Sequence, residues 1–243
     1  MRLSIVVPVY REGENARATL AALAVGAPQP HEILVVHDEA NDPTLPVIAD
    51  LQREHPQIRG VHNTLGRGPA WALRAGFQAA RGTAVLVTMA DASDDIGDIA
   101  PMLARLEAGD DVVAASRYMP GGRQVGGPPF KGFLSRTAGM SLHWLIGLPT
   151  SDPTSAFKLY RRAMLERLPL ESDAGFELAL EITVKAFLAG YRVGEVPTTW
   201  NDRVAGQSNF KLLRWLPRYL RWYGLALRKG LIRGRAGAVR ASL

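Results

Sequence analysis

Short apolar runs alternate with segments of helical spacing along the chain. The runs are rich in Val, Ile and Leu, which is typical of buried strands, and strands are expected at residues 3–7, 32–36, 60–62, 84–88 and 112–115. Between them, apolar residues recur three and four positions apart, the pattern of helices, at 14–23, 43–54, 68–80 and 99–106. Further helices are expected at 135–148, 161–167 and 176–189, with strands at 157–160 and 193–199.

This alternation predicts an α/β fold with a mostly parallel sheet and helices on both faces. Ligands of such sheets bind at the carboxyl ends of the strands. Pro8, Tyr10, Asp38 and Asp91 all fall there, in three loops that are expected to converge on one crevice. The Gly- and Pro-rich segment 121–131, GGRQVGGPPFK, is expected to be a mobile loop, and one use for it is a lid.

The stretch TMADASDD, residues 88–95, places three carboxylates directly after a predicted strand. Asp91, Asp94 and Asp95 concentrate negative charge where a buried strand is expected to end. One use for Asp94 or Asp95 is a helix cap, a common role of Asp before a helix that is expected to start near Ile96.

Composition narrows the class of protein. With 243 residues, 47% of them hydrophobic, the chain can form one large α/β domain or two small ones. It has no cysteine, which excludes disulfides, zinc–thiolate sites and a thiol nucleophile and fits a reducing compartment. The start MRLSIVVPVY favours a first strand over a signal peptide, so a cytoplasmic location is expected. No stretch reaches the roughly 18 apolar residues of a spanning helix.

Charge is distributed unevenly. All 23 acidic side chains lie in residues 1–202, whereas residues 203–243 carry ten of the 29 basic ones. In the tail, basic residues at 211, 214, 218, 221 and 228 share one helical face. The apolar face holds Leu212, Leu216, Tyr219, Leu220, Tyr223 and Leu227, with Trp215 and Trp222 near the boundaries.

This amphipathic pattern favours a helix lying in an anionic membrane surface, with Pro217 either kinking it or opening its second half. The alternative is a helix docked on its own domain or in a homo-oligomer. A nucleic-acid role is disfavoured, because no known binding module surrounds the basic tail.

Two nucleotide-binding motifs are missing. The turn after the first strand, Pro8-Val-Tyr-Arg-Glu-Gly-Glu, is not the glycine-rich turn of a dinucleotide-binding dehydrogenase. A phosphate loop ending in Gly-Lys-Ser or Gly-Lys-Thr is also lacking, which excludes ordinary P-loop chemistry.

Seven short blocks, in order, carry a resemblance that covers nearly all of residues 3–211. They are Ile5-Val-Val-Pro-Val-Tyr-Arg-Glu, Glu32-Ile-Leu-Val-Val-His-Asp, Asn63-x-x-Gly-Arg-Gly, the acidic cluster at 91–95, Ser116-Arg-Tyr, Ser151-Asp-Pro-Thr-Ser and Arg203-x-x-Gly-x-Ser. Together they resemble family 2 glycosyltransferases, most closely the branch with dolichyl-phosphate mannose synthase and polyprenyl-phosphate sugar transferases. The resemblance implies a GT-A fold, an NDP-sugar donor, Mg²⁺ or Mn²⁺ as cofactor, and inversion at the anomeric carbon.

The resemblance also implies roles for the donor-side residues. Asp91 matches the second Asp of the family's Asp-x-Asp motif, whereas Met89 stands at the first. Asp94 is then the candidate to supply the second metal carboxylate, unless substrate phosphates hold most of the metal. Pro8, Tyr10, Glu12 and Asp38 are expected to line the base and ribose, with His37 standing where the family has another Asp. Glu12 could instead serve only as part of a turn and helix cap.

On the acceptor side, Arg117, Lys131, Ser135 and Arg203 match positions that contact phosphates in the lipid-phosphate branch. Cationic and hydroxyl donors suit a dianionic phosphate. The turn 152–155 resembles a family turn and could be purely structural. An acceptor with a sugar hydroxyl would need a general base instead, and Asp173 or Glu177 would be the candidates.

Three functions are therefore weighed. The leading hypothesis is an inverting transferase that moves a sugar from an NDP-sugar to a polyprenyl or dolichyl phosphate, with residues 1–209 as the GT-A domain. Residues 210–243 would contact the cytoplasmic face of the membrane as a peripheral element. The alternatives are transfer to a sugar hydroxyl and a non-catalytic nucleotide-sugar-binding protein, the latter motivated by Met89 and His37.

Overall fold

The apolar runs of the sequence form strands that are covered on both faces. In the computed structural model, which describes residues 2–202 and 212–241, every residue of β1 (Leu3–Val9), β4 (Ala84–Val87) and β5 (Val112–Ser116) is buried. A strand covered on both sides has no polar face, so its sequence shows no alternation. These predicted strands are confirmed, with ends shifted by at most two residues.

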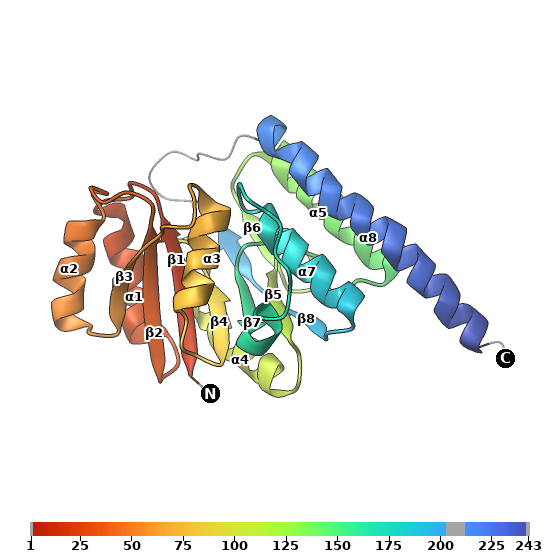
Figure 1. Cartoon of the computed structure of the whole chain (residues 1–243), viewed down its shortest axis with the longest axis horizontal. Helices are drawn as coiled ribbons and strands as arrows, with labels where there is room; N and C mark the ends of the chain where they lie inside the picture. Colours follow the sequence, from red (N-terminus) through yellow and green to blue (C-terminus); the bar gives the residue numbers. More distant parts are fainter. Residues whose placement is uncertain (1, 203–211, 242–243) are drawn as a thin grey trace.

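Seven strands form the central sheet in the order β3-β2-β1-β4-β7-β5-β8 (Figure 1). Only β7 runs antiparallel to its neighbours, and it lies between β4 and β5. The carboxyl ends of β1, β2, β4 and β5 therefore share one edge with the start of β7. The strands not yet given are β2 (His31–His37), β3 (Ile58–His62), β7 (Lys158–Arg161) and β8 (Val193–Pro197).

Helices cover both faces of the sheet and close two apolar cores. Alternate residues of β1 divide between them, because neighbouring side chains of a strand point to opposite faces. Ile5 faces the core under α1, α2 and α4, whereas Val6 faces the core under α3, α6 and α7. The bounds are α1 Asn15–Gly26, α2 Leu45–Glu54, α3 Pro69–Ala79, α4 Ile99–Glu107, α6 Arg162–Leu165 and α7 Glu177–Ala189, with a 3₁₀ turn at Ile96–Asp98.

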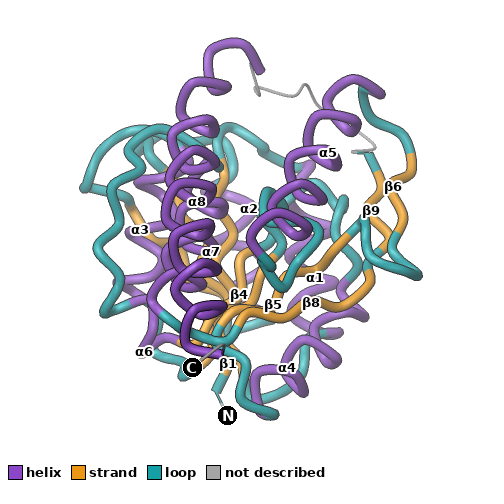
Figure 2. The backbone as a smooth tube through the Cα atoms, turned by 90° about the vertical axis from the view of Figure 1, so that its right-hand side faces the viewer, coloured by secondary structure: helices purple, strands orange, loops and turns teal. Residues whose placement is uncertain are grey.

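A third core joins α7 to the two long helices α5 (Pro129–Ile146) and α8 (Leu212–Ala241). Figure 2 views the molecule from this side, with α5 and α8 next to one another. Trp222, expected near the boundary of the helix faces, is in fact only 2% exposed and packs with Leu180 and Ala226. Its Nε1–H donates to Ser172 Oγ at 3.0 Å. This half of α8 is thus docked on its own domain.

Pro217 lies inside α8 and does not open a separate helix. A proline removes only one intrahelical hydrogen bond, and the packing of the following turns on α5 and α7 keeps the chain helical.

The segment expected as a mobile loop is partly regular. Residues 123–125 form β6 (Arg123–Val125), which pairs with β9 (Thr199–Asn201), and α5 begins at Pro129 rather than near residue 135. The partner strand is more than 70 residues away in the sequence, so local pattern could not reveal this pairing. Proline at the first helical position is favourable, because its missing N–H needs no partner there.

Candidate active site

Asp38, directly after β2, ties together the loops on the donor side of the carboxyl edge. Its Oδ1 accepts from Asn63 Nδ2 at 2.7 Å, and its Oδ2 accepts from the Gly68 N–H at 2.8 Å. Asn63 Nδ2 also donates to the Gly66 carbonyl at 2.6 Å. These bonds explain the block Asn63-x-x-Gly-Arg-Gly as a loop folded around the Asp38 carboxylate. Each oxygen keeps a second lone pair, so Asp38 can still accept from a ligand.

The turn after β1 lies beside this loop, because β1 and β2 are adjacent and end in register. Pro8 is buried in β1, whereas Tyr10 is half exposed and Glu12 is partly buried. The Arg11 N–H donates to Asp42 Oδ2 at 2.9 Å and fixes the turn. The structure therefore gathers Pro8, Tyr10, Glu12 and Asp38 at one edge, as expected, and their contact with a base and ribose stays a prediction.

His37, which stands where the family has another Asp, does not replace that carboxylate as a ligand for the NDP-sugar. Its ring is buried and stacks on His62, with ring centroids 5.2 Å apart, and its Nδ1 lies 2.9 Å from the Glu39 carbonyl oxygen. The residue therefore joins the ends of β2 and β3.

The acidic cluster after β4 divides into three environments. Asp94 Oδ2 accepts from Thr88 Oγ1 at 2.8 Å and from the Met89 N–H at 3.2 Å. Withdrawal from water, offset in part by these hydrogen bonds and reinforced by the Asp91 charge, raises the Asp94 pKa to about 6. Asp91 Oδ1 accepts from the Ser93 N–H at 3.2 Å. Asp95 caps the 3₁₀ turn through the Gly97 N–H at 2.9 Å, so the capping interpretation of Asp95 is confirmed.

Arg117, at the end of β5, is the centre of a polar cluster on the acceptor side. Its Nε and Nη2 donate to the two oxygens of Asp152, at 2.6 and 2.9 Å, and Nη2 also donates to Ser135 Oγ at 3.2 Å. Ser135 Oγ lies 2.6 Å from Thr154 Oγ1. The guanidinium also lies against the rings of Tyr118 and Trp200, so it is held firmly while its side chain stays 15% exposed.

Asp152 and Lys158 are the buried charged residues of this cluster. Burial opposes ionisation of Asp152, but the charge and hydrogen bonds of Arg117 outweigh it and lower the Asp152 pKa. Lys158 is fully buried, and its ammonium donates to the carbonyls of Asp152, Pro153 and Ser155. Sequence reasoning treated 152–155 only as a turn and missed Asp152 as the partner of Arg117. An Asp in a Pro-containing turn was the sole signal.

Lys131 and Ser135 are one helical turn apart on α5, so both lie on the side of the helix that meets Arg117. Arg136, the other basic neighbour of Ser135, is exposed. Arg203, expected to contact phosphate, lies outside the described residues.

The two candidate bases differ sharply in environment. Asp173 is exposed, with one oxygen 4.0 Å from Arg218 Nη2. Glu177 opens α7 and is 1% exposed.

A family model for glycosyl transferase family 2 matches residues 4–168, more than half of the chain. The chain belongs to this family. Its sequence is 33% identical over 213 residues to a polyprenol monophosphomannose synthase of Mycolicibacterium smegmatis, covering 85% of this chain and 80% of that protein. It is 30% identical to an undecaprenyl-phosphate mannosyltransferase of Micrococcus luteus, covering 95% and 100% of the two chains.

Among solved structures, this glycosyltransferase resembles the mannosyltransferase PcManGT of Pyrobaculum calidifontis in complex with GDP-Man and Mn²⁺. The TM-score is 0.62 at 19% identity, with 98% of this chain and 75% of that one covered. The expected GT-A fold is thereby confirmed.

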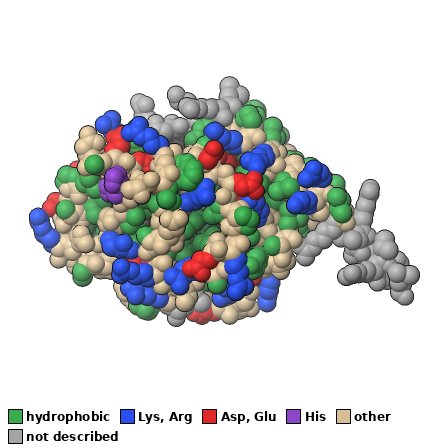
Figure 3. Space-filling model, in the orientation of Figure 1, with side chains coloured by type: hydrophobic (Ala, Val, Ile, Leu, Met, Phe, Trp, Pro, Cys, Tyr) green, Lys and Arg blue, Asp and Glu red, His purple; other side chains and the backbone are tan. Residues whose placement is uncertain are grey.

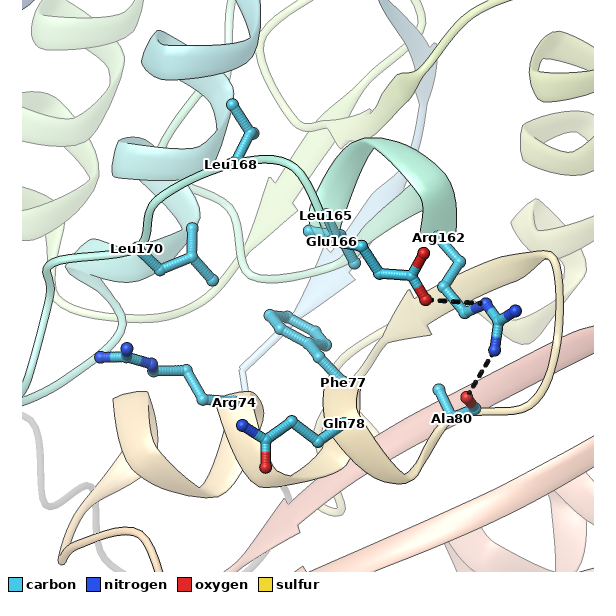
Figure 4. Close-up of a pocket in the computed structure, with 9 residues that line it drawn as sticks. All are labelled: Arg74, Phe77, Gln78, Ala80, Arg162, Leu165, Glu166, Leu168 and Leu170. Carbon is cyan, nitrogen blue, oxygen red and sulfur yellow. Dashed lines mark hydrogen bonds and ion pairs between the residues drawn. The ribbon is translucent and has the colours of Figure 1, made fainter.

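The glycosyltransferase also has a cavity of about 410 Å³ far from this edge (Figure 4). It is lined by apolar side chains such as Phe77 and Leu165 and by Arg74 and Arg162. Because Arg162 follows the end of the antiparallel β7, the cavity lies toward the amino ends of the parallel strands. It plays no part in the candidate active site.

Proposed function

We propose that this glycosyltransferase moves a sugar, with inversion, from an NDP-sugar to the phosphate of a polyprenyl or dolichyl lipid. The observation that carries the proposal is the cluster of Arg117, Ser135 and Thr154 beside the acidic loop. The cluster and the acidic loop are linked through β9: the Trp200 ring lies against the Arg117 guanidinium, and the N–H of the next residue, Asn201, donates to the Ser93 carbonyl at 3.0 Å. The names of the two relatives, both polyprenyl-phosphate mannosyltransferases, support the same acceptor class.

A phosphate acceptor explains why the cluster offers donors but no free base: its carboxylate, Asp152, is buried, and both of its oxygens accept from Arg117. A phosphate oxygen is already ionised at neutral pH, so it needs orientation and charge compensation. Two hydrogen bonds to the Asp152 carboxylate fix the orientation of the Arg117 guanidinium. The planar guanidinium and the Ser135 hydroxyl can then orient the phosphate. The oriented oxygen attacks the anomeric carbon as the bond from that carbon to the diphosphate breaks, and attack from the opposite face inverts the centre.

The acidic loop fits a divalent cation held partly by substrate. Within the part of the chain that the structure describes, no three acidic or His side chains converge on one point. Asp91 and Asp94 are coupled electrostatically, and two carboxylates plus diphosphate oxygens are a common ligand set for Mg²⁺ or Mn²⁺. When bound, such a cation neutralises the charge that develops on the leaving diphosphate.

The test is to incubate the protein with Mn²⁺, a panel of NDP-sugars and a short polyprenyl phosphate, and to search for glycolipid by mass spectrometry. Product is expected with the phosphate and none with the matching polyprenol. Arg117→Lys keeps the charge but loses the fork, so turnover should fall on the order of a hundredfold. Arg136→Lys, a change at an exposed arginine of α5, is the matched control.

Two outcomes would favour the alternatives. Comparable transfer to a simple glycoside would make a sugar hydroxyl the acceptor and promote Asp173 or Glu177 as general base. Binding of NDP-sugars without any turnover would favour a nucleotide-sugar-binding protein.

Peripheral contact with an anionic membrane belongs to the same proposal. No helix in the described part of the chain is long and apolar enough to span a bilayer. The apolar face of α8 is used largely for docking, so a membrane would instead meet exposed apolar side chains on the outer sides of α5 and α8. These are Phe130, Phe133, Trp144, Leu145, Leu220, Leu231 and Ile232. Basic side chains are interspersed with hydrophobic ones on the side of the molecule that α8 occupies (Figure 3).

A further inference from the structure

The loop before α7, residues 171–176, contacts both α8 and the loop that precedes α3. On the α8 side, Trp215 covers Gly175 so closely that a Cβ at this glycine would overlap the indole ring. The same ring stacks on Phe176, with ring centroids 6.2 Å apart and the two planes inclined by 26°. The first turns of α8 therefore hold the end of this loop.

Ser172 fastens the other end of the loop to three helices. Its Oγ accepts from the Nε1–H of Trp222 on α8 at 3.0 Å, and its carbonyl accepts from Arg74 Nη1 on α3 at 3.3 Å. Its N–H donates to Glu181 Oε2 on α7 at 2.7 Å. Because this end is fixed, the contact with Trp215 decides where the remaining residues of the loop lie.

The same loop also contacts the donor side of the candidate active site. The Ala174 carbonyl oxygen lies 2.8 Å from the position that a Cβ on Gly68 would take. The Gly68 N–H in turn donates to Asp38 Oδ2 at 2.8 Å. A continuous series of contacts therefore runs from the Trp215 ring, through this loop, to the Asp38 carboxylate.

We infer that Trp215 is a positioning residue for the donor site. Its ring keeps the loop before α7 in contact with Gly68, and the Gly68 N–H fixes the carboxylate of Asp38. The inference rests on the proposed function, in which Asp38 lines the NDP-sugar. Without the ring, binding of the donor must also order the loop, and this ordering lowers the affinity. The helix expected to serve the membrane thus also takes part in donor binding.

The inference is tested by calorimetry with Mn²⁺ and GDP-mannose or UDP-glucose, without acceptor and at a temperature where thermal unfolding shows every variant to be folded. In Trp215→Ala, the affinity for the preferred NDP-sugar should fall about fivefold or more, because the loop is no longer held. Trp215→Phe keeps an aromatic ring against Gly175 and should stay within about twofold of the original protein.

Tyr223→Phe is the matched control on the same helix. It removes the hydrogen bond of 2.8 Å between the Tyr223 and Ser141 hydroxyls, which joins α8 to α5. This variant should lose some stability and keep the donor affinity within about twofold of the original value.

Gly175→Ala approaches the same contact from the loop. Its methyl group should displace Trp215 and weaken donor binding about as much as Trp215→Ala does. In the double variant the ring is absent, so the added methyl group should change the affinity by less than about twofold. Fully additive losses would show that the two residues act independently and would overturn the inference.

Two further results would overturn it. One is a lower melting temperature of Trp215→Ala with unchanged donor affinity, which would show a packing role only. The other is an equal loss of affinity in Trp215→Ala and Tyr223→Phe. The proposed function has a separate readout, because an original protein that binds NDP-sugar but does not glycosylate polyprenyl phosphate would overturn that function alone.

Discussion

Asp94 shows how one residue can combine structural and functional demands. Its carboxyl holds the chain after β4 through Thr88 and Met89, yet its pKa is raised to about 6, mainly because it is withdrawn from water. The folded chain keeps this proton up to about pH 6, whereas the unfolded chain releases it near the ordinary value of 3.8. The contribution of Asp94 to stability therefore falls as pH rises between these two values.

A cation near Asp91 must displace the Asp94 proton, so affinity for Mn²⁺ with GDP should weaken below about pH 6, by up to tenfold per pH unit. Calorimetry between pH 5 and 7.5 measures this. Because the terminal phosphate of the nucleotide also titrates near pH 6, the comparison with Asp94→Asn isolates the side chain. That variant should bind more weakly with a flatter pH profile, whereas Asp95→Asn should keep the original profile. An unchanged profile in Asp94→Asn would contradict the prediction.

At this scale the sequence predicted residue identities better than residue partners. The carboxylates at 38 and 91 could be placed because each directly follows a buried strand. The pairing of Arg117 with Asp152 joins positions 35 apart in the chain, and no local pattern encodes it. Nor could the sequence distinguish the exposed Asp173 from the buried Glu177, since both depend on how α8 covers the start of α7.

Among the elements, the loop between β3 and α3 and the loop before α7 depend on one close contact. Gly68 has φ +104°, and any Cβ there would lie 2.8 Å from the Ala174 carbonyl oxygen. The loop that holds Asp38 and the loop that carries the candidate base Asp173 thus meet where only glycine fits.

Gly68→Ala should therefore lower stability by about 1–3 kcal/mol, because the loop between β3 and α3 and the loop before α7 are forced apart. It should also weaken NDP-sugar binding, because the displaced Gly68 N–H holds Asp38. Gly147→Ala is the matched control. Gly147 also has positive φ, but nothing lies within 4 Å of the new Cβ, so it should lose only about 1–2 kcal/mol and keep donor affinity. Denaturant unfolding and calorimetry measure the two effects. Equal loss of donor affinity in both variants would mean that general destabilisation is the cause.

Most helices and strands of the sheet could be predicted because apolar runs and helical periodicity are local properties. The pairing of β6 with β9 and the docking of α8 could not, because both depend on partners far along the chain. An amphipathic helix needs a cover for its apolar face, but its sequence does not say whether protein or lipid provides it.

For the whole molecule, the α5 and α8 side differs from the opposite end in its exposed apolar side chains. Phe130 and Phe133 are each 65% exposed in the first turns of α5, near Lys131. Truncation at residue 209 would uncover the third core around Trp222, so point changes are the cleaner test of membrane contact.

The double variant Phe130→Ser, Phe133→Ser should bind vesicles of phosphatidylglycerol and phosphatidylcholine on the order of tenfold more weakly, because two apolar side chains no longer insert. Binding of the original chain should also weaken with added salt, since each basic side chain near the surface contributes about 1 kcal/mol. Val25→Ser, 77% exposed on α1, is the control and should bind as the original does. Equal co-sedimentation of all three proteins at low salt would show that the start of α5 does not contribute to membrane binding.

The antiparallel β7 acts as a spacer within the catalytic edge. Adjacent strands lie roughly 4.8 Å apart, so inserting β7 moves the ends of β4 and β5 to about twice that distance. The Asp91 loop and Arg117 would stand almost side by side if β4 and β5 were neighbours, and two bound phosphates would then repel one another at close range. If the proposed site residues hold the two phosphates, one strand between them leaves room for a sugar ring between the leaving and the attacking phosphate. The strand order thus sets the distance between the Asp91 loop and Arg117.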